Sequence, residues 1–575
     1  MRRAAARAVA VVVTLATAVG LGACAQIPTS GPVRVGNANV DAQVDIAMLP
    51  KGPSLGAAPD QIVSGFLGAA QAATTSPEEF QTAREFLTDD VAETWDPETS
   101  VRVVREAPVP EQLEQGTGDL QDRDTVEVVV RATTIATLDS AGAYTEVGDP
   151  REVAYRFTLV NNGGEWRISA LDNGVLVSAN LFANQYRATH LFFPDANDIT
   201  SLVPDLRWFP RRSWRTAAVQ QVLAGPPEWL QGATQTLIPE GTQLVSPAVQ
   251  DARDGEAAII RLSDQISAVP ADQRAVIAAQ FSETLSEGSG RTVPVDLFSG
   301  TNRLSLDQVQ VDLPATIVRP MAMIDGHLYL VEDGEVVESD RAVDLAGMDP
   351  TALAISPATE PIVVRDGTDE IVDVSGDAGA ETIITGSDLA APSVDKMGAV
   401  WTSGITGRLR VYRAEVGEVS LTPSWLAGRR VISVSVAPEG SRVAIVSEAP
   451  SGTQVQVAGV VRDTAGNPVD LVSPISVGAP VGNIREVRWS GITTLALLAD
   501  GTEGTTGVWT AGVGGLAGTG GESRQLSGLT SVEQLAAGVT EQGILVITEG
   551  GALEREETGV WQPFAEDVDL VAFPG

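Results

Sequence analysis

The sequence has very little cysteine, histidine and lysine. Among 575 residues there are one Cys (Cys24) and two His, and the only lysines are Lys51 and Lys396. A single cysteine cannot form an internal disulfide. With two histidines it also excludes a Cys/His zinc site and most histidine-based acid–base chemistry.

Positive charge is also scarce. The chain holds 38 Lys and Arg against 75 Asp and Glu, a formal net charge of −37. Such a chain repels phosphate backbones, so we expect no nucleic-acid partner. Hydrophobic residues make up 43% and charged residues 20%, which predicts folded domains with hydrophobic cores. The length predicts about four domains, or three if one is a large all-β body.

The N-terminus is typical of an export signal. Arg2, Arg3 and Arg7 precede a mostly apolar run over residues 8–21, which is too short for a permanent membrane span. The run ends in a sequence that resembles the bacterial lipobox, formed by Leu21, Gly22, Ala23 and Cys24. We therefore predict a signal peptide over 1–23, cleaved before Cys24. The alternative is an ordinary signal peptide with a chance cysteine.

The resemblance to a lipobox implies covalent diacylglycerol on the Cys24 thiol and an N-acyl chain on its new amine. We expect no other cofactor and no metal. Two or more acyl chains give stable membrane anchoring, so we expect the protein at the cell membrane. Residues 24–59 are rich in Pro, Gly, Ser and Ala, a composition typical of a flexible tether.

Three bodies are predicted after the tether. In residues 60–190, an amphipathic helix with Ile62, Val63 and Phe66 on one face precedes strand-like segments. This α+β order is similar to the NTF2-like cone fold. In residues 195–312, helices over 214–224 and 271–285 and strands over 257–262 and 293–298 resemble the α/β GerMN module, which implies a binding role.

Residues 313–575 contain short β-type runs and almost no helical pattern. Similar segments recur at intervals of about 40–50 residues, beginning near 352, 392, 432, 484 and 532. This spacing predicts a β-propeller of six blades. A partial sixth copy at 569–574 is expected to close the ring by pairing with strands near 321–338.

One cationic and aromatic cluster stands out in this acidic chain. It consists of Arg207, Trp208, Arg211, Arg212, Trp214 and Arg215. Trp and Arg dominate binding hot spots, so the cluster is a candidate partner contact. Alternatively, the tryptophans pack in the core and the arginines pair locally.

Two further patterns mimic functional motifs. Ser393 and Lys396 match S-x-x-K, but in a β repeat where no helix aligns the pair. Asp195 opens a segment like a calcium loop that lacks two of the required positions. No catalytic residues are identified.

The order of lipobox, tether, cone, GerMN module and propeller resembles the actinobacterial lipoprotein LpqB family. The resemblance rests also on Gly52-Pro53-Ser54, on Gly65-Phe66-Leu67 and on Trp95. It implies a non-enzymatic accessory protein on the extracytoplasmic face of the membrane, whose partner is the sensor histidine kinase MtrB of the MtrA–MtrB two-component system. Alternatives are an envelope glycan hydrolase with a carboxylate pair in the propeller, and a passive cell-wall binder.

Overall fold

The computed structural model describes residues 51–575 apart from short stretches, which are 74–79, 112–123, 246–248, 250–256, 287–291, 315–318, 333–334, 340–342, 344, 359, 376–378, 406, 502–504, 530 and 540–542. The predicted signal peptide, the lipobox and Cys24 lie outside the described residues. Contacts join Leu49–Gly575 into one unit, which contains three successive bodies.

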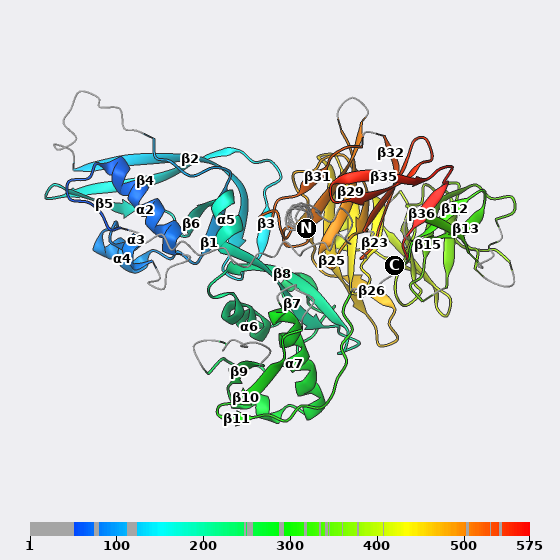
Figure 1. The fold of residues 1–575 in the computed structure, drawn as a ribbon, viewed down its shortest axis with the longest axis horizontal. Coiled ribbons are helices and arrows are strands. Elements are labelled where there is room, and N and C mark those ends of the chain that lie inside the picture. Colours follow the sequence, from blue (N-terminus) through cyan, green and yellow to red (C-terminus); the bar gives the residue numbers. More distant parts are fainter. Residues whose placement is uncertain are drawn as a thin grey trace, which may run out of the picture. The chain divides into compact units, whose positions relative to one another are not determined.

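The first body is a curved sheet covered by a helix. Helix α2 (Pro59–Ala73) buries Ile62, Val63 and Phe66, which confirms the predicted apolar face. It packs on strands β2 (Thr125–Asp139), β5 (Glu165–Ala170) and β6 (Val175–Ser178) of the sheet (Figure 1). The short helices α3 (Gln81–Arg84) and α4 (Asp89–Thr94) follow.

The sheet of the first body has the order β5-β4-β2-β1-β6, and β3 pairs with β2. Its strands are β1 (Ser100–Val104), β2 (Thr125–Asp139), β3 (Tyr144–Glu146), β4 (Glu152–Asn162), β5 (Glu165–Ala170) and β6 (Val175–Ser178). β1 and β6 run parallel, and the other pairs are antiparallel. Helix α5 (Ala179–Gln185) ends the body.

The second body begins with a two-stranded ribbon that the sequence did not predict. β7 (Tyr186–Pro194) pairs along its whole length with β8 (Leu202–Pro210). The boundary expected near residue 190 therefore falls inside a strand. The remaining elements are α6 (Trp214–Ala224), η2 (Glu228–Leu230), β9 (Ala258–Leu262), η3 (Asp264–Ala268), α7 (Ala271–Leu285), β10 (Val295–Ser299) and β11 (Asn302–Arg303).

Both helices of the second body begin and end where the sequence predicted them. α7 packs on β7 and β10, and α6 packs on both strands of the ribbon. The ribbon therefore lies against the helices of its own body. A three-stranded sheet of order β11-β10-β9 completes the body.

The C-terminal region consists of six separate sheets within the described residues. Five of them follow the chain in order, which matches the predicted repeats. Their strands are β15 (Pro350–Ile355), β16 (Ile362–Asp366), β17 (Glu370–Asp373) and β18 (Glu381–Thr385) in sheet II; β19 (Ser393–Val394), β20 (Val400–Ser403), β21 (Leu409–Arg413) and β22 (Gly417–Leu421) in sheet III; β23 (Arg430–Val436), β24 (Arg442–Ala449), β25 (Gly452–Arg462), β26 (Pro468–Leu471) and β27 (Ile475–Val477) in sheet IV; β28 (Ile484–Trp489), β29 (Thr494–Asp500), β30 (Thr506–Gly512) and β31 (Arg524–Leu526) in sheet V; and β32 (Val532–Ala537), β33 (Ile544–Thr548), β34 (Leu553–Glu557) and β35 (Val560–Ala565) in sheet VI.

Sheet I joins the two ends of this region. It contains β12 (Met321–Ile324), β13 (His327–Glu332) and β14 (Glu335–Glu338), and its fourth strand is β36 (Leu570–Ala572). β36 pairs antiparallel with β12, as predicted, and also lies against β15 of sheet II (Figure 1). β36, the last strand among the described residues, thereby completes sheet I.

The innermost strands of the six sheets contact one another in a cycle. The cycle runs β15, β19, β23, β28, β32, β36 and back to β15. Four of these contacts carry a side-chain to backbone hydrogen bond between neighbouring sheets: the backbone N–H groups of Val436, Val487, Leu535 and Val571 donate to Ser393, Ser433, Glu486 and Gln534 respectively. A β-bulge occurs in β15, β23, β28 and β32 at the same place, near the strand start.

Candidate functional site

The predicted anchor residue, Cys24, lies outside the described residues, so its lipidation stays a prediction. In the described part of the chain, no helix is long and apolar enough to cross a membrane. The same part contains no group of three or more His, Cys, Asp or Glu side chains placed to hold a metal ion.

The structure does not bring the six cationic and aromatic residues onto one exposed surface. Arg207, Trp208 and Trp214 are all buried. Arg207 Nε lies 2.6 Å from Asp205 Oδ2, and Trp208 Nε1 donates to the carbonyl of Gly514 at 2.9 Å. These contacts agree with the alternative interpretation, in which the tryptophans pack in the core and the arginines pair locally.

The exposed part of the cluster lies at the start of α6. Arg211 and Arg212 are exposed, and Arg215 is half-buried. The guanidinium groups of Arg187 and Arg215 stack on the Trp214 indole, 4.2 and 4.7 Å from its centre. This arrangement holds positive charge at the surface of an acidic protein.

The ribbon β7–β8 contacts both of its neighbours. Trp208 packs on Tyr144 and Phe182 of the first body, with ring centres 5.8 and 5.1 Å apart. At its other end, the Ser441 Oγ of sheet IV donates to Asp195 Oδ2 at 2.5 Å. Asp195 also accepts from two backbone N–H groups of its own turn, so this carboxylate has a structural role and the calcium-loop resemblance gains no support.

A fully buried arginine of sheet IV contacts the ribbon. Arg442 pairs with Glu439 at 2.6 Å, and its guanidinium stacks 4.6 Å from the ring centre of Trp489. It also donates to the carbonyls of Pro204 in the ribbon and Ile492 in sheet V. This role of Arg442 could not be found from sequence, because every partner except Glu439 is distant along the chain.

His190 faces the same junction from β7. Its Nε2 lies 2.9 Å from Thr493 Oγ1. Burial, together with the nearby Arg442 charge, lowers the pKa of His190 to about 4. The side chain is therefore a neutral, structural histidine at neutral pH, in line with its apolar sequence neighbours.

The S-x-x-K pair is separated in the fold. Ser393 Oγ accepts from Val436 N, whereas Lys396 Nζ donates to Ser201, which directly precedes β8, at 3.0 Å. Asp395, which precedes Lys396, is buried and pairs with Arg462 at 2.6 Å. The motif therefore contributes to packing between elements and forms no nucleophile pair.

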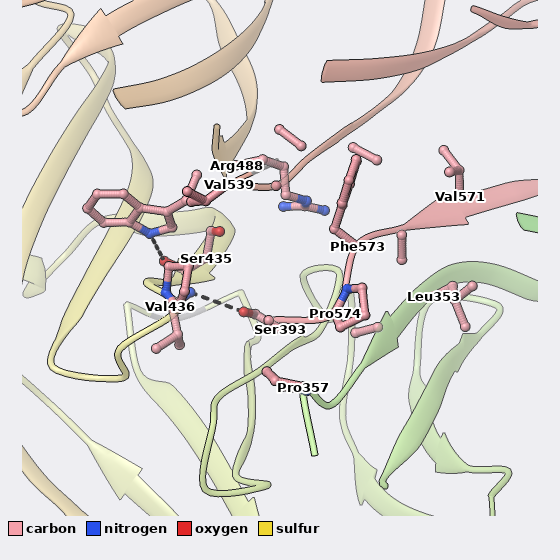
Figure 2. Close-up of a pocket in the computed structure, with 18 of the residues that line it drawn as sticks. Leu353, Pro357, Ser393, Ser435, Val436, Arg488, Val539, Val571, Phe573 and Pro574 are labelled. Carbon is pink, nitrogen blue, oxygen red and sulfur yellow. Dashed lines mark hydrogen bonds between the residues drawn. The ribbon is translucent and has the colours of Figure 1, made fainter. Parts of the chain in front are cut away.

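A small cavity lies where the six innermost strands converge, and it is shown in Figure 2. Its volume is about 50 Å³. Lining residues come from all six sheets, including Leu353, Ser393, Val436, Trp489, Ala537 and Phe573. Sequence reasoning missed this cavity because its wall is assembled from residues of all six sheets, which are far apart in the sequence.

Arg488 is the one charged side chain among the described residues that line this cavity. Figure 2 shows its guanidinium pointing toward Phe573 and Pro574 across the open centre. No Asp or Glu belongs to the lining, so the alternative of a sugar hydrolase with a carboxylate pair finds no support in this cavity.

Comparison with known families gives three consecutive matches. Residues 52–183 match the N-terminal domain of lipoprotein LpqB, and residues 190–297 match the Germane domain, described as sporulation and spore germination. Residues 315–573 match the lipoprotein LpqB beta-propeller domain. Each match falls on one of the three bodies of the structure.

Relatives that align with nearly the whole chain are also named lipoprotein LpqB. Lipoprotein LpqB from Cutibacterium acnes is 25% identical, with 97% of this chain and 98% of the relative covered. Lipoprotein LpqB from Streptomyces coelicolor is 28% identical, with 96% of both chains covered. Among solved structures, TolB from Acinetobacter baumannii aligns with 57% of this chain and 81% of its own, at 13% identity and a TM-score of 0.34.

Proposed function

Because this chain belongs to the LpqB family of lipoproteins, we propose that it is an accessory regulator of a membrane sensor histidine kinase of the MtrB type. The observation that carries the proposal is the match of three family domains, in order, to the three bodies of one chain. The family name further supports a protein anchored to the membrane through lipid.

The anchor is Cys24, which carries diacylglycerol and an N-acyl chain after residues 1–23 are removed. The protein then lies on the extracytoplasmic face of the cell membrane. Confinement to the membrane plane raises its effective concentration near the kinase without any additional contact. The protein shifts the signalling equilibrium of the kinase only if it binds two kinase states with unequal affinity.

The three bodies provide the binding scaffold. The first body is an NTF2-like cone and the second a GerMN module. The six C-terminal sheets are the blades of a closed propeller, a proposal supported by the cyclic contacts of their innermost strands. The exposed arginines at the start of α6, Arg211 and Arg212, are the proposed contact with an acidic surface of the kinase sensor domain.

The protein is proposed to act without catalysis. Relatives are named as lipoproteins. The polar side chains that the sequence suggested for chemistry, Ser393, Lys396 and Asp195, are engaged in internal contacts. Binding rather than turnover is therefore the activity to measure.

The proposal is tested by crosslinking in intact cells. Wild-type protein is compared with a Cys24→Ser variant and with an Arg211→Glu/Arg212→Glu variant, and crosslinked partners are identified by mass spectrometry. We expect the kinase among wild-type partners, its loss with Cys24→Ser, and a reduced yield with the charge-reversed pair.

An Arg485→Glu variant provides the matched control, because Arg485 is exposed on a different body. Absence of the kinase from wild-type crosslinks would contradict the proposal. So would full regulation by the Cys24→Ser protein released from the membrane.

A further inference from the structure

The cavity at the convergence of the six innermost strands combines one guanidinium with an apolar wall. Arg488 reaches into it from β28, while Val436, Val571 and Phe573 contribute apolar surface (Figure 2). A guanidinium in such surroundings is poorly solvated. It therefore favours an acceptor, above all a carboxylate, over a neutral apolar guest.

Neighbouring groups hold the Arg488 guanidinium in place. Nη2 lies 2.5 Å from Glu486 Oε1, and Nη1 donates to the carbonyl of Val487 at 2.9 Å and more weakly to Ser433 Oγ at 3.5 Å. Glu486 is itself fixed, since its second oxygen accepts from Leu535 N at 3.1 Å. The side chain is thus pre-positioned before any ligand arrives, which lowers the entropy cost of binding.

The guanidinium keeps donor capacity for a ligand. Arginine has five N–H donors, and among the described residues no acceptor lies on Nε of Arg488. Two polar groups nearby already accept hydrogen bonds: Ser393 Oγ accepts from Val436 N, and the Ser435 carbonyl accepts from Trp489 Nε1. Arg488 is the charged side chain of the lining, so it is the group that would recognise an anionic ligand.

Cavity size limits the guest. A volume of about 50 Å³ is roughly a third of the ~150 Å³ apolar cavity that accommodates benzene in another protein. A sugar ring or an aromatic ring does not fit. Four lining residues, Pro357, Pro438, Val539 and Pro574, are half-buried, as Arg488 is. We take these four as the rim on the side that faces solvent, through which a narrow group reaches Arg488.

We propose that this cavity binds a carboxylate carried on a small apolar group, with Arg488 as its anchor. Two sources share that chemistry: a free short-chain carboxylic acid, and the C-terminal residue of a peptide that ends in a small side chain. The site is independent of the proposed kinase contact at α6, which lies on another body.

The test uses the full-length acylated protein in lipid nanodiscs and ligand-observed NMR. The probes are acetate and acetyl-alanyl-alanine, and the matched controls are acetamide and the peptide amide. We expect saturable binding of at least one acid and no saturable binding of either amide. Binding of acetate alone identifies a free-acid site, and binding of the peptide identifies a chain-end site.

Two variants separate the site from folding. Arg488→Gln should weaken binding of the acid about tenfold or more, because a charge-assisted hydrogen bond is lost. Val539→Phe should block the rim while every hydrogen bond described above remains. Arg485→Gln, on the same strand but exposed and paired with Asp500, should bind like wild type.

Equal binding of acid and amide, or no saturable binding of either acid to the wild-type protein, would overturn the proposal. If Arg488→Gln lowers the melting temperature, the result for Val539→Phe decides: unchanged affinity in that variant places the probe elsewhere.

Discussion

The first body and the six C-terminal sheets fill their interiors with different side chains. The first body has one core, in which Phe66 packs edge-on against Trp95 and Phe157, with ring centres 5.2 and 6.0 Å away. The C-terminal sheets have several smaller cores between neighbouring sheets, built mostly from Val, Ala, Leu and Ile.

Buried charge follows the same division. Among its described residues, the first body buries no Asp, Glu, Arg or Lys, whereas the C-terminal region buries the Arg442–Glu439 pair together with Asp395. In the first body, large aromatic rings from several elements pack together in one core. Between the C-terminal sheets the side chains are small, so hydrogen bonds and ion pairs fix the orientation of one sheet relative to the next. We therefore expect a destabilising substitution to affect the whole first body, whereas a substitution among the C-terminal sheets should affect only neighbouring sheets. Substitutions in the buried ion pairs of the C-terminal region are the exception.

The largest effect is expected at the buried pair. Arg442→Met should lower the free energy of unfolding by about 3–5 kcal/mol, because Glu439 is left as an uncompensated buried charge. Denaturant unfolding measures the change. The double variant Arg442→Met/Glu439→Leu should recover most of the loss, and Arg485→Ala, from an exposed pair, should cost less than about 1 kcal/mol. Equal losses in the single and double variants would contradict this account.

Replacing one buried leucine by alanine in each region compares how far the resulting loss of stability extends. Leu159→Ala and Leu497→Ala each remove a fully buried side chain, and each should cost about 2–5 kcal/mol. Hydrogen exchange should increase throughout the first body for Leu159→Ala, but only in sheets IV and V for Leu497→Ala.

The exposed Leu55 supplies the control for this pair, since Leu55→Ala should change stability by no more than about 0.5 kcal/mol. Faster exchange in sheet II of the Leu497→Ala variant would show that the C-terminal region responds as a single core instead.

The contact between the ribbon β7–β8 and the C-terminal sheets should become less stable at acid pH. His190 has an ordinary pKa of 6.5, and its pKa in the fold is about 4, so the unfolded chain binds the proton more readily between these values. Its stabilising contribution is complete above pH 6.5 and is lost as the pH falls toward 4, by up to about 3 kcal/mol. Unfolding of wild type and His190→Gln across this range measures the difference.

His327, the other histidine, is exposed on β13, and His327→Gln should keep the wild-type pH profile. If His190→Gln keeps that profile as well, the acid sensitivity belongs to carboxylates elsewhere.

The smallest effect is expected at a hydrogen bond between sheets. The Gln534 amide accepts from Val571 N at 3.2 Å and donates to Val571 O at 3.1 Å. Gln534→Leu should cost about 1–3 kcal/mol and should increase hydrogen exchange in β36 and β12. Gln525→Leu, exposed on β31, should leave exchange in both strands unchanged.

Elements with their own periodicity were predictable from sequence. The bounds of α6 and α7 agree with the predicted ones, because apolar positions at helical spacing mark both helices and a Gly-Pro-Pro stop marks the end of α6. The repeats of the C-terminal region were visible because each sheet starts with a similar apolar run. The pairing of β36 with β12 followed from the partial last repeat.

The ribbon and the cavity were not predictable. Strand β8 is buried along nearly its whole length, so it shows no alternation of polar and apolar residues. Its polar residues Asp205 and Arg207 find each other and distant partners such as Trp229. Reading Arg207 and Trp208 as a surface patch reflects this missing tertiary context. The cavity wall comes from six sheets, and no short motif describes it.

The strand that completes sheet I has a consequence for biosynthesis. β36 supplies the partner of β12, yet the two strands are separated by about 250 residues of chain, and β12 is made long before β36 leaves the ribosome. The edge of β12 therefore has no strand partner until β36 has been synthesised. The C-terminal region can reach its final form only after that point, so a stop codon anywhere before β36 leaves the edge of β12 without its partner.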